Sequence, residues 1–222
     1  MSRVITGTVS TVTPSLVAPL DLQYVRKHVR AVTDVEDDLL EGMVLAARDY
    51  WEEQTGRSIM QTVFDYWLDG FPMPAWSAQT RILLPKPPLV SVESVAYTDS
   101  GGTDQEFTDG VSPAMNLYVV GKPVGLYASP GWVVPASGEV WPIPEFSPGA
   151  VRIRFTAGYA ETADEVPAII KAQLLMLVGA MDQFRSEVHY SEGARVEKVP
   201  LGILDLTAFK YTNTQVLRSA WP

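Results

Sequence analysis

Hydrophobic periodicity divides the chain into three parts, and this division constrains the fold more than any other sequence feature. Residues 21–57 and 160–211 repeat apolar side chains at spacings of three and four, which is typical of helices. Residues 58–159 alternate apolar with polar side chains, which is typical of strands with one buried face. We therefore predict an α+β fold, with a small helical bundle built from both chain ends and an inserted, mainly antiparallel β region.

Two helices are expected before the β region. The first covers residues 21–30, where Leu22, Val25 and Val29 form one apolar stripe. The second covers residues 34–55, because acidic residues fill its first turn and favour the helix dipole, and Gly56 fits the position after its last turn. Residues 1–20 before these helices read as an arm.

The β region is expected to contain several short strands separated by proline- and glycine-rich turns. Residues 129–149 read as an ordered loop or as short strands, because proline and glycine are frequent there. Clear strands are predicted at 60–68, 81–84, 91–98 and 151–156, and weaker ones near 105–108, 115–120 and 124–128.

A third long helix is expected at residues 167–184. It is apolar on most sides, which indicates a helix that is buried centrally or in an assembly. Its main stripe contains Ile170, Leu174, Leu177, Val178 and Met181. A short helix is expected from Pro200, and residues 212–222 form a polar tail that carries Val216, Leu217 and Trp221.

Composition removes several classes of function. The 222 residues include no cysteine, which excludes disulfide scaffolds, thiol catalysis and cysteine-bound zinc, and only two histidines. The formal charge of −9 disfavours a protein that grips nucleic-acid phosphates. The common nucleophile, phosphate-loop and metalloprotease motifs are absent. We expect no enzyme activity, cofactor or metal, and no membrane span or signal peptide, so a cytosolic origin is the default.

Three groups of residues leave alternative interpretations open. The acidic run from Asp34 to Glu41 suggests a cation site or, more simply, a solvated helix start. The indoles of Trp76, Trp132 and Trp141 suit sugar or base stacking, or else they cover the sheet. Arg152 and Arg154 lie on one strand face and could contact nucleic acid. The net negative charge of the chain disfavours this interpretation.

Several ordered segments carry a resemblance to one protein family. They are AARDYWEEQTGR at 46–57, ILLPKPPLVSVESVAY at 82–97, VRIRFTAGY at 151–159 and VPAIIKA at 166–172, followed by RSE at 185–187. In this order they resemble the head–tail connector, or adaptor, proteins of long-tailed bacteriophages and gene transfer agents. The resemblance spans residues 20–190.

The resemblance implies a structural virion protein at the head–tail junction, assembled in the host cytoplasm. Members of this family form a ring, usually of twelve copies, below the portal protein. The ring extends the DNA channel and presents a surface to a neck, stopper or tail-terminator protein. An acidic ring would not hold the DNA that passes through its lumen. The rival interpretation is a non-catalytic virion accessory module that binds carbohydrate or protein through Trp132 and Trp141.

A ring implies two kinds of contact. Because a ring interface joins two different faces of the same subunit, the long helices 34–55 and 167–184 are expected to form its wall. The expected interface residues are Leu40, Met43, Tyr50, Trp51, Leu175, Met181 and Phe184. The tail is expected to dock on the portal through Val216, Leu217 and Trp221, because aromatic anchors often dominate interfaces.

Overall fold

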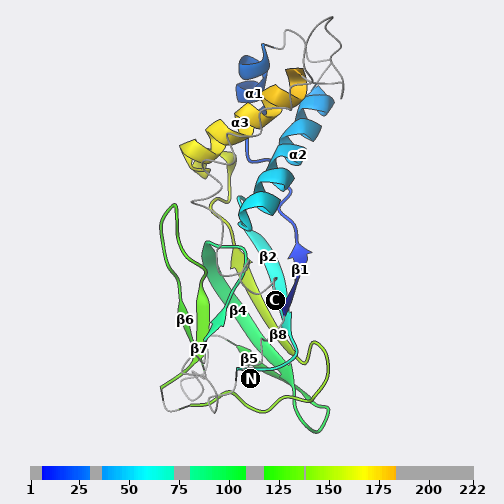
Figure 1. The fold of residues 1–222 in the computed structure, drawn as a ribbon, viewed down its shortest axis with the longest axis vertical. Helices are drawn as coiled ribbons and strands as arrows, with labels where there is room; N and C mark the ends of the chain where they lie inside the picture. The colour runs from blue at the N-terminus through cyan, green and yellow to red at the C-terminus, as the bar shows by residue number, and fades with distance from the viewer. Residues whose placement is uncertain (1–6, 31–36, 73–80, 109–117, 138, 184–222) are drawn as a thin grey trace, which may run out of the picture. The chain divides into compact units, whose positions relative to one another are not determined.

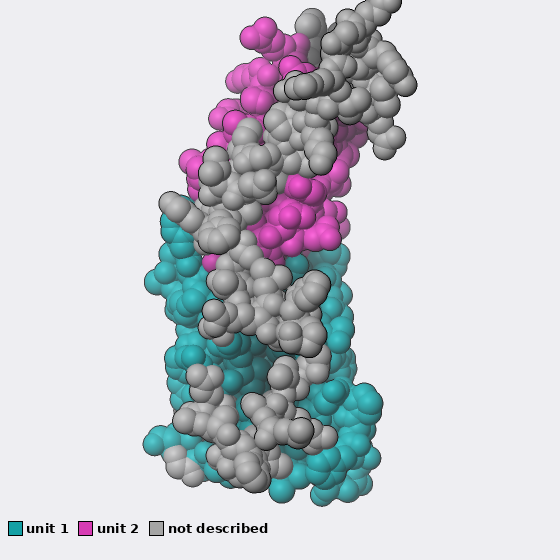
Figure 2. Space-filling view, viewed as in Figure 1, with its two compact units in different colours: residues 1–14, 61–158, 213–222 teal, residues 15–60, 159–212 magenta. Residues whose placement is uncertain are grey.

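A computed structural model describes residues 7–30, 37–72, 81–108, 118–137 and 139–183 of the chain. These residues form two compact units (Figures 1 and 2). The β unit contains residues 7–14 and 61–158, and the helical unit contains residues 15–60 and 159–183, in each case as far as they are described. The fold is therefore α+β, as predicted from the periodicity.

The helical unit contains three α-helices within its described residues: α1 (Leu22–Val29), α2 (Asp37–Thr55) and α3 (Ala168–Gln183), with the 3₁₀ turn η2 (Ala163–Glu165) before α3. The three predicted helices are confirmed within these bounds. Asp21 caps α1, because its carboxylate accepts hydrogen bonds from the backbone N–H groups of Gln23 and Tyr24. Gly56 follows α2 with a φ of +66°, a left-handed conformation that glycine adopts without strain.

The core of the helical unit lies between facing stripes of α2 and α3. Trp51 is fully buried, and its indole Nε1 donates a 2.7 Å hydrogen bond to Oε1 of Gln173. Val25 of α1 adds to this core. The other buried residues of the two long helices include Leu40, Val44, Ala47, Ile170, Leu174, Leu177 and Val178. The predicted stripe of α3 is thus confirmed, except that Met181 is only half-buried.

The β unit contains two antiparallel sheets within its described residues. The larger sheet has the strand order β1-β2-β8-β4-β5, and the smaller has the order β3-β7-β6. The strands are β1 (Gly7–Thr13), β2 (Thr62–Leu68), β3 (Ile82–Leu83), β4 (Leu89–Thr98), β5 (Asp104–Thr108), β6 (Tyr118–Gly121), β7 (Trp132–Pro135) and β8 (Val151–Ala157).

One hydrophobic core is shared by the two sheets, because each presents alternate side chains to it. Strand β8 is the clearest example: Val151, Ile153 and Phe155 are fully buried, while the residues between them face the other way. Beyond the strands, the ring of Phe71 stacks on Trp141 at 4.6 Å between centroids. The smaller sheet contributes Ile82 and Val133 to the same core.

The structure corrects two expectations from the sequence. Residues 7–13 of the expected arm form β1, which pairs with β2, and the sequence did not predict this strand because almost every residue of β1 is exposed and shows no buried alternation. The strand expected at 124–128 is a loop in which Gly125 has a φ of +115°. Strand β7 instead forms within residues 129–149, one of the two alternatives for that segment.

Candidate functional site

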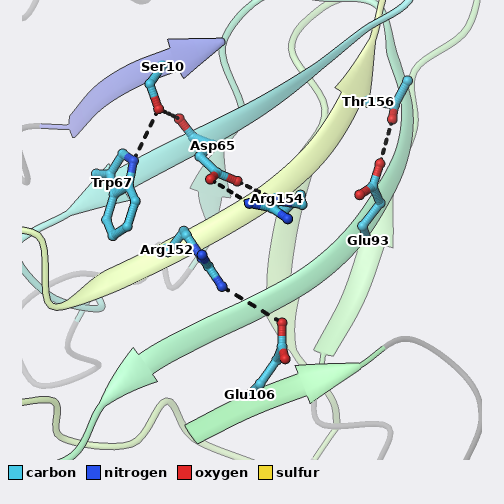
Figure 3. A network of polar contacts seen from close by, with 8 residues as sticks. All are labelled: Ser10, Asp65, Trp67, Glu93, Glu106, Arg152, Arg154 and Thr156. Carbon is cyan, nitrogen blue, oxygen red and sulfur yellow. Dashed lines mark hydrogen bonds and ion pairs between the residues drawn. The ribbon is translucent and has the colours of Figure 1, made fainter. Parts of the chain in front are cut away.

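A network of polar side chains lies on the side of the five-stranded sheet opposite the shared core (Figure 3). We call this side the outer face; it carries Ser10, Asp65, Trp67, Glu93, Glu106, Arg152, Arg154 and Thr156 (Figure 3). The residues come from strands far apart in the sequence, and the sheet register places them in rows across the strands.

The first row centres on an ion pair between β2 and β8. Asp65 lies directly opposite Arg154, and both carboxylate oxygens accept hydrogen bonds of 2.8 Å from the guanidinium. Asp65 is only 5% exposed, so the bidentate hydrogen bonds from Arg154 replace the water contacts that its carboxylate lacks. The hydrogen bonds to Asp65 raise the pKa of Arg154 above its ordinary value, with smaller contributions from the charges of Asp65, Glu93 and Glu106.

The second row centres on Arg152. Its guanidinium lies 5.7 Å from the ring centroid of Trp67, within the range of a cation–π interaction. On its other side the next strand places Ala96 opposite Arg152, and this small residue lets the arginine reach Glu106 of β5 at 4.0 Å. Trp67 is held in turn by a 3.2 Å hydrogen bond from its Nε1 to Ser10.

A bulge in β4 supplies the last contact of the outer face. The pairing of β4 with β8 shifts between Val92 and Ser94, so Glu93 is the extra residue at this point. Its carboxylate accepts a 2.8 Å hydrogen bond from the hydroxyl of Thr156. The outer face therefore links all five strands of the larger sheet through polar side chains.

This arrangement is that of a structural network. In the described part of the sheet, Arg152 and Arg154 are each paired with a carboxylate of the same sheet, which offsets the positive charge that phosphates would need. These ion pairs favour a structural role for Arg152 and Arg154 over contact with nucleic acid, which stays an untested hypothesis. Within the described ranges, no three His, Cys, Asp or Glu side chains group closely enough to hold a metal ion.

The tryptophans proposed as a sugar-binding platform are packed against the protein. Trp141 is buried and stacked on Phe71. Trp132 is half-buried, and its ring lies so close to Gly121 that a Cβ at this glycine would overlap it. Both residues cover the sheets, as the simpler interpretation predicted, and Trp76 lies outside the described residues.

The expected ring-interface residues fall into three groups. Leu40, Trp51 and Leu175 are buried within the subunit, so their side chains belong to its own core and are not exposed to a neighbour. Met43, Tyr50 and Met181 are half-buried, and Phe184 lies outside the described residues. The strongest apolar stripe of each helix packs against its neighbour within the helical unit, which is why sequence reasoning selected these positions.

Other apolar side chains of the same helices face solvent. On α3 the exposed residues include Ile169, Ala172 and Met176, on a face without a charged side chain. On α2 they include Leu39 and Leu45. The signal for the α3 face was present in the sequence, because a helix that is apolar on nearly all sides cannot bury every side against a single partner helix.

The remaining candidate residues carry little chemistry or are not described. Asp37, from the acidic helix start, forms a bidentate ion pair with Arg26 of α1, so it is a structural contact. Asp34 and Glu36 lie outside the described residues, as do Val216, Leu217 and Trp221. None of the helices in the described ranges is both long enough and apolar enough to cross a membrane.

Solved structures with the same fold come from gene transfer agent (GTA) particles. A chain from the neck of an empty GTA particle, computed with C6 symmetry, has a TM-score of 0.67 at 19% identity, covering 93% of this chain and 96% of that chain. With the same identity and coverage, a chain from the virion of a native particle has a TM-score of 0.64 and one from a native neck computed with C12 symmetry has 0.60. No family model and no curated protein matches the chain.

Proposed function

We propose that this chain is a structural subunit of the neck of a tailed bacteriophage or gene transfer agent, and specifically a head–tail connector. The observation that carries the proposal is the likeness to chains of GTA neck and virion structures over 93% of this chain and 96% of those chains. The function is assembly without catalysis: a ring below the portal protein extends the DNA channel and joins the capsid to a neck, stopper or tail-terminator protein.

The ring forms through two different faces of each subunit. Two of the similar chains come from necks computed with C6 and C12 symmetry, which supports a cyclic arrangement, and we favour twelve copies. In a cyclic ring one face must meet a different face of the next copy. The charge-free face of α3, with Ile169 and Met176, meets the side of α2 that carries the exposed Leu45, because both helix faces bury apolar area on contact.

The other contacts of the ring are proposed from the sequence. The tail docks on the portal through Val216, Leu217 and Trp221, and a different surface of the ring receives the next neck protein. DNA passes through the lumen without specific binding, because the chain has a net charge of −9. Salt-dependent DNA binding by the purified protein would contradict this part of the proposal.

Imaging tests the location directly. Purified particles are labelled with gold through a tag on this chain, and portal complexes are imaged by negative stain with and without the purified protein. The proposal expects label at the head–tail junction and an added ring on the portal. Label elsewhere on the particle, or conversion of a substrate by the protein, would overturn it. A free monomer in solution is compatible with a ring that closes only on the portal.

A charge placed on the helix face tests the ring contact. Met176→Glu puts a carboxylate in the middle of the α3 face and is expected to abolish ring closure on the portal, because a buried unpaired charge is costly. Gln23→Glu adds the same charge at an exposed position of α1 and serves as the matched control. The proposed ring interface is wrong if both variants close rings equally well.

Deletion of residues 214–222 tests the tail. The truncated chain is expected to lose association with portal-bearing heads while the described units keep their melting temperature. Trp221→Ala in the otherwise complete chain separates loss of the aromatic anchor from loss of the whole segment. Association that is unchanged by both variants would end the tail hypothesis.

A further inference from the structure

A short loop of the β unit displays three large apolar side chains in solvent. Between β7 and β8, Val140 is 69% exposed, Ile143 is 60% exposed and Phe146 is 87% exposed. Single exposed apolar residues are ordinary on protein surfaces, but three within seven positions gather exposed apolar area on one short loop, which is typical of an interaction site. We call residues 139–147 the apolar loop.

Contacts with the rest of the β unit hold the apolar loop in place. Trp141, between the exposed residues, is buried and stacks on Phe71 at 4.6 Å with the rings nearly parallel. Pro144 forms an isolated β-bridge with Asp99, and the backbone N–H of Glu145 donates a 2.8 Å hydrogen bond to the carbonyl of Thr98. The exposed side chains therefore project from an anchored backbone.

The chain that follows the loop is also fixed. Gly149 donates its backbone N–H to the carboxylate of Asp69 at 3.0 Å, and Thr98 donates to the carbonyl of Ala150 at 2.9 Å. Pro142, Pro144 and Pro148 restrict the backbone further, since each fixes its own φ angle. A surface ordered before binding loses little conformational entropy in a complex, which favours affinity.

The charges around the loop define the partner. The β4–β5 turn that holds the loop contributes Asp99 and Asp104, and the loop itself contributes Glu139 and Glu145. Neither residues 97–104 nor residues 139–150 contain lysine or arginine. An apolar centre with an acidic rim is complementary to an apolar groove that is bordered by basic side chains.

We propose that the apolar loop is a docking element for another protein, whose surface has an apolar groove flanked by lysine or arginine. The side chains of Phe146 and Ile143 enter the groove, and Glu139 and Glu145 pair with the basic border of the groove. An anionic membrane is the wrong occupant, since its surface repels these carboxylates. A second copy that presents the same loop is disfavoured too, because its acidic rim would face the acidic rim of the first copy. This surface is distinct from the helix faces and the tail assigned to the ring.

Photocrosslinking identifies the occupant. The photoreactive residue p-benzoyl-phenylalanine replaces Phe146 in the full chain, in producing cells and in purified particles, and cross-linked peptides are mapped by mass spectrometry. Val124 is the matched control site, because it is 90% exposed in the β6–β7 loop. The proposal expects a position-146 product whose peptide lies in an apolar groove with basic neighbours. Products only with lipid or with this same chain, or identical products from both positions, would overturn it.

Binding measurements with the identified protein test the chemistry. The double variant Ile143→Ser/Phe146→Ser is expected to weaken binding about tenfold or more, and Val124→Ser to leave it unchanged. Glu139→Lys/Glu145→Lys is expected to weaken binding most at low salt, where its charges repel the basic border. Equal affinity of the wild type and both double variants would refute the docking element, provided that their melting temperatures match.

The outcome is separable from that of the proposed function. If gold label lies at the head–tail junction but position 146 yields no cross-link to another protein, the docking element fails and the connector role stands. If the chain is absent from particles but position 146 cross-links to a basic-rimmed groove in cells, the connector role fails and the docking element stands.

Discussion

The two units each join distant parts of the chain through a polar contact, but the chemistry of the two contacts is opposite. In the β unit, Asp65 and Arg154 are charged, lie 89 positions apart and share two hydrogen bonds of 2.8 Å. In the helical unit, Trp51 and Gln173 are neutral, lie 122 positions apart and share one bond of 2.7 Å. Among the described residues, the Nε2 amide of Gln173 has no acceptor.

The two contacts differ because burying an unpaired charge costs more free energy than burying an unpaired amide. A buried carboxylate without a partner costs several kcal/mol, so Asp65 is stable on the outer face only with both oxygens engaged. An unsatisfied amide N–H costs only about 1–3 kcal/mol, which the packing around Gln173 is able to offset. We infer that the β unit depends on its polar pair for stability, whereas the helical unit depends mainly on apolar packing.

The largest expected effect is on that apolar packing. Trp51→Ala removes the largest fully buried side chain of α2 and is expected to cost about 4 kcal/mol in the free energy of unfolding. Urea denaturation followed by far-UV circular dichroism measures this loss. Trp67→Ala, which removes the same side chain from a partly exposed site on the outer face, is the matched control with an expected cost of about 1 kcal/mol. Equal losses would contradict the packing argument.

The next effect tests the charged pair. Arg154→Met leaves the carboxylate of Asp65 nearly buried and unpaired, and it is expected to cost about 2–3 kcal/mol. This estimate lies below the range for fully buried pairs because the arginine side chain is 33% exposed. The double variant Asp65→Thr/Arg154→Thr replaces the pair with a cross-strand threonine pair and is expected to recover more than half of the loss. A double variant less stable than Arg154→Met would show that the pair itself, and not the orphaned charge, sets the stability.

In the β unit, the sequence predicts the face on which a side chain lies but not its partner on the neighbouring strand. The alternation in β8 predicts that Arg152 and Arg154 share a face, because side-chain direction is a local property of a strand. Their partners depend on the register of β2 and β5 against other strands, and period-two patterns from distant segments do not fix that register. Strand β1 was missed for a related reason: it is ordered by pairing and buries almost nothing.

In the helical unit, the sequence predicts the elements and their packing better than it predicts their exposed surface. Its helices and their buried stripes follow from the sequence, but the sequence alone does not show which of their apolar side chains remain exposed. Leu40 and Trp51 have the periodicity of a contact face, and the subunit uses them for its own core. Ile169 and Met176 face solvent only because α2 and α1 cover other sides of α3, which requires knowledge of the packing.

A smaller effect is expected at the neutral pair. Gln173→Met keeps a similar side-chain volume. It removes the unsatisfied amide, which stabilises the fold, and the acceptor of the Trp51 indole, which destabilises it. Because these two effects nearly cancel, the free energy of unfolding is expected to change by no more than about 1 kcal/mol. Gln173→Ala leaves a cavity as well and is expected to cost about 2 kcal/mol. Urea denaturation of both variants measures the difference. A Gln173→Met variant as unstable as Gln173→Ala would mean that the hydrogen bond outweighs the packing.

The smallest effect concerns a carboxylate in the turn that holds the apolar loop. Asp99 accepts backbone hydrogen bonds from Thr103 at 3.0 Å and Gly101 at 2.8 Å, and these bonds, with one from the Gln105 side chain, lower its pKa below the ordinary 3.8. A lowered pKa in the folded state stabilises the fold above the unfolded-state pKa, and this contribution is lost as the pH falls through the folded-state value. The wild type should therefore lose stability below about pH 4 in part through Asp99.

Asp99→Asn tests this titration, because an amide has no charge to lose. The variant is expected to melt at most a few degrees below the wild type at neutral pH, and the gap is expected to narrow as the pH falls from about 5 to about 2. Asp104→Asn, at the start of β5, is the control, since it removes the same charge from a carboxylate that accepts a hydrogen bond from the Thr98 hydroxyl, whereas Asp99 accepts from backbone N–H groups. A gap that stays constant with pH would mean that Asp99 acts through shape alone. The charge-assisted turn would then be no more sensitive to acid than the neutral contact of the helical unit.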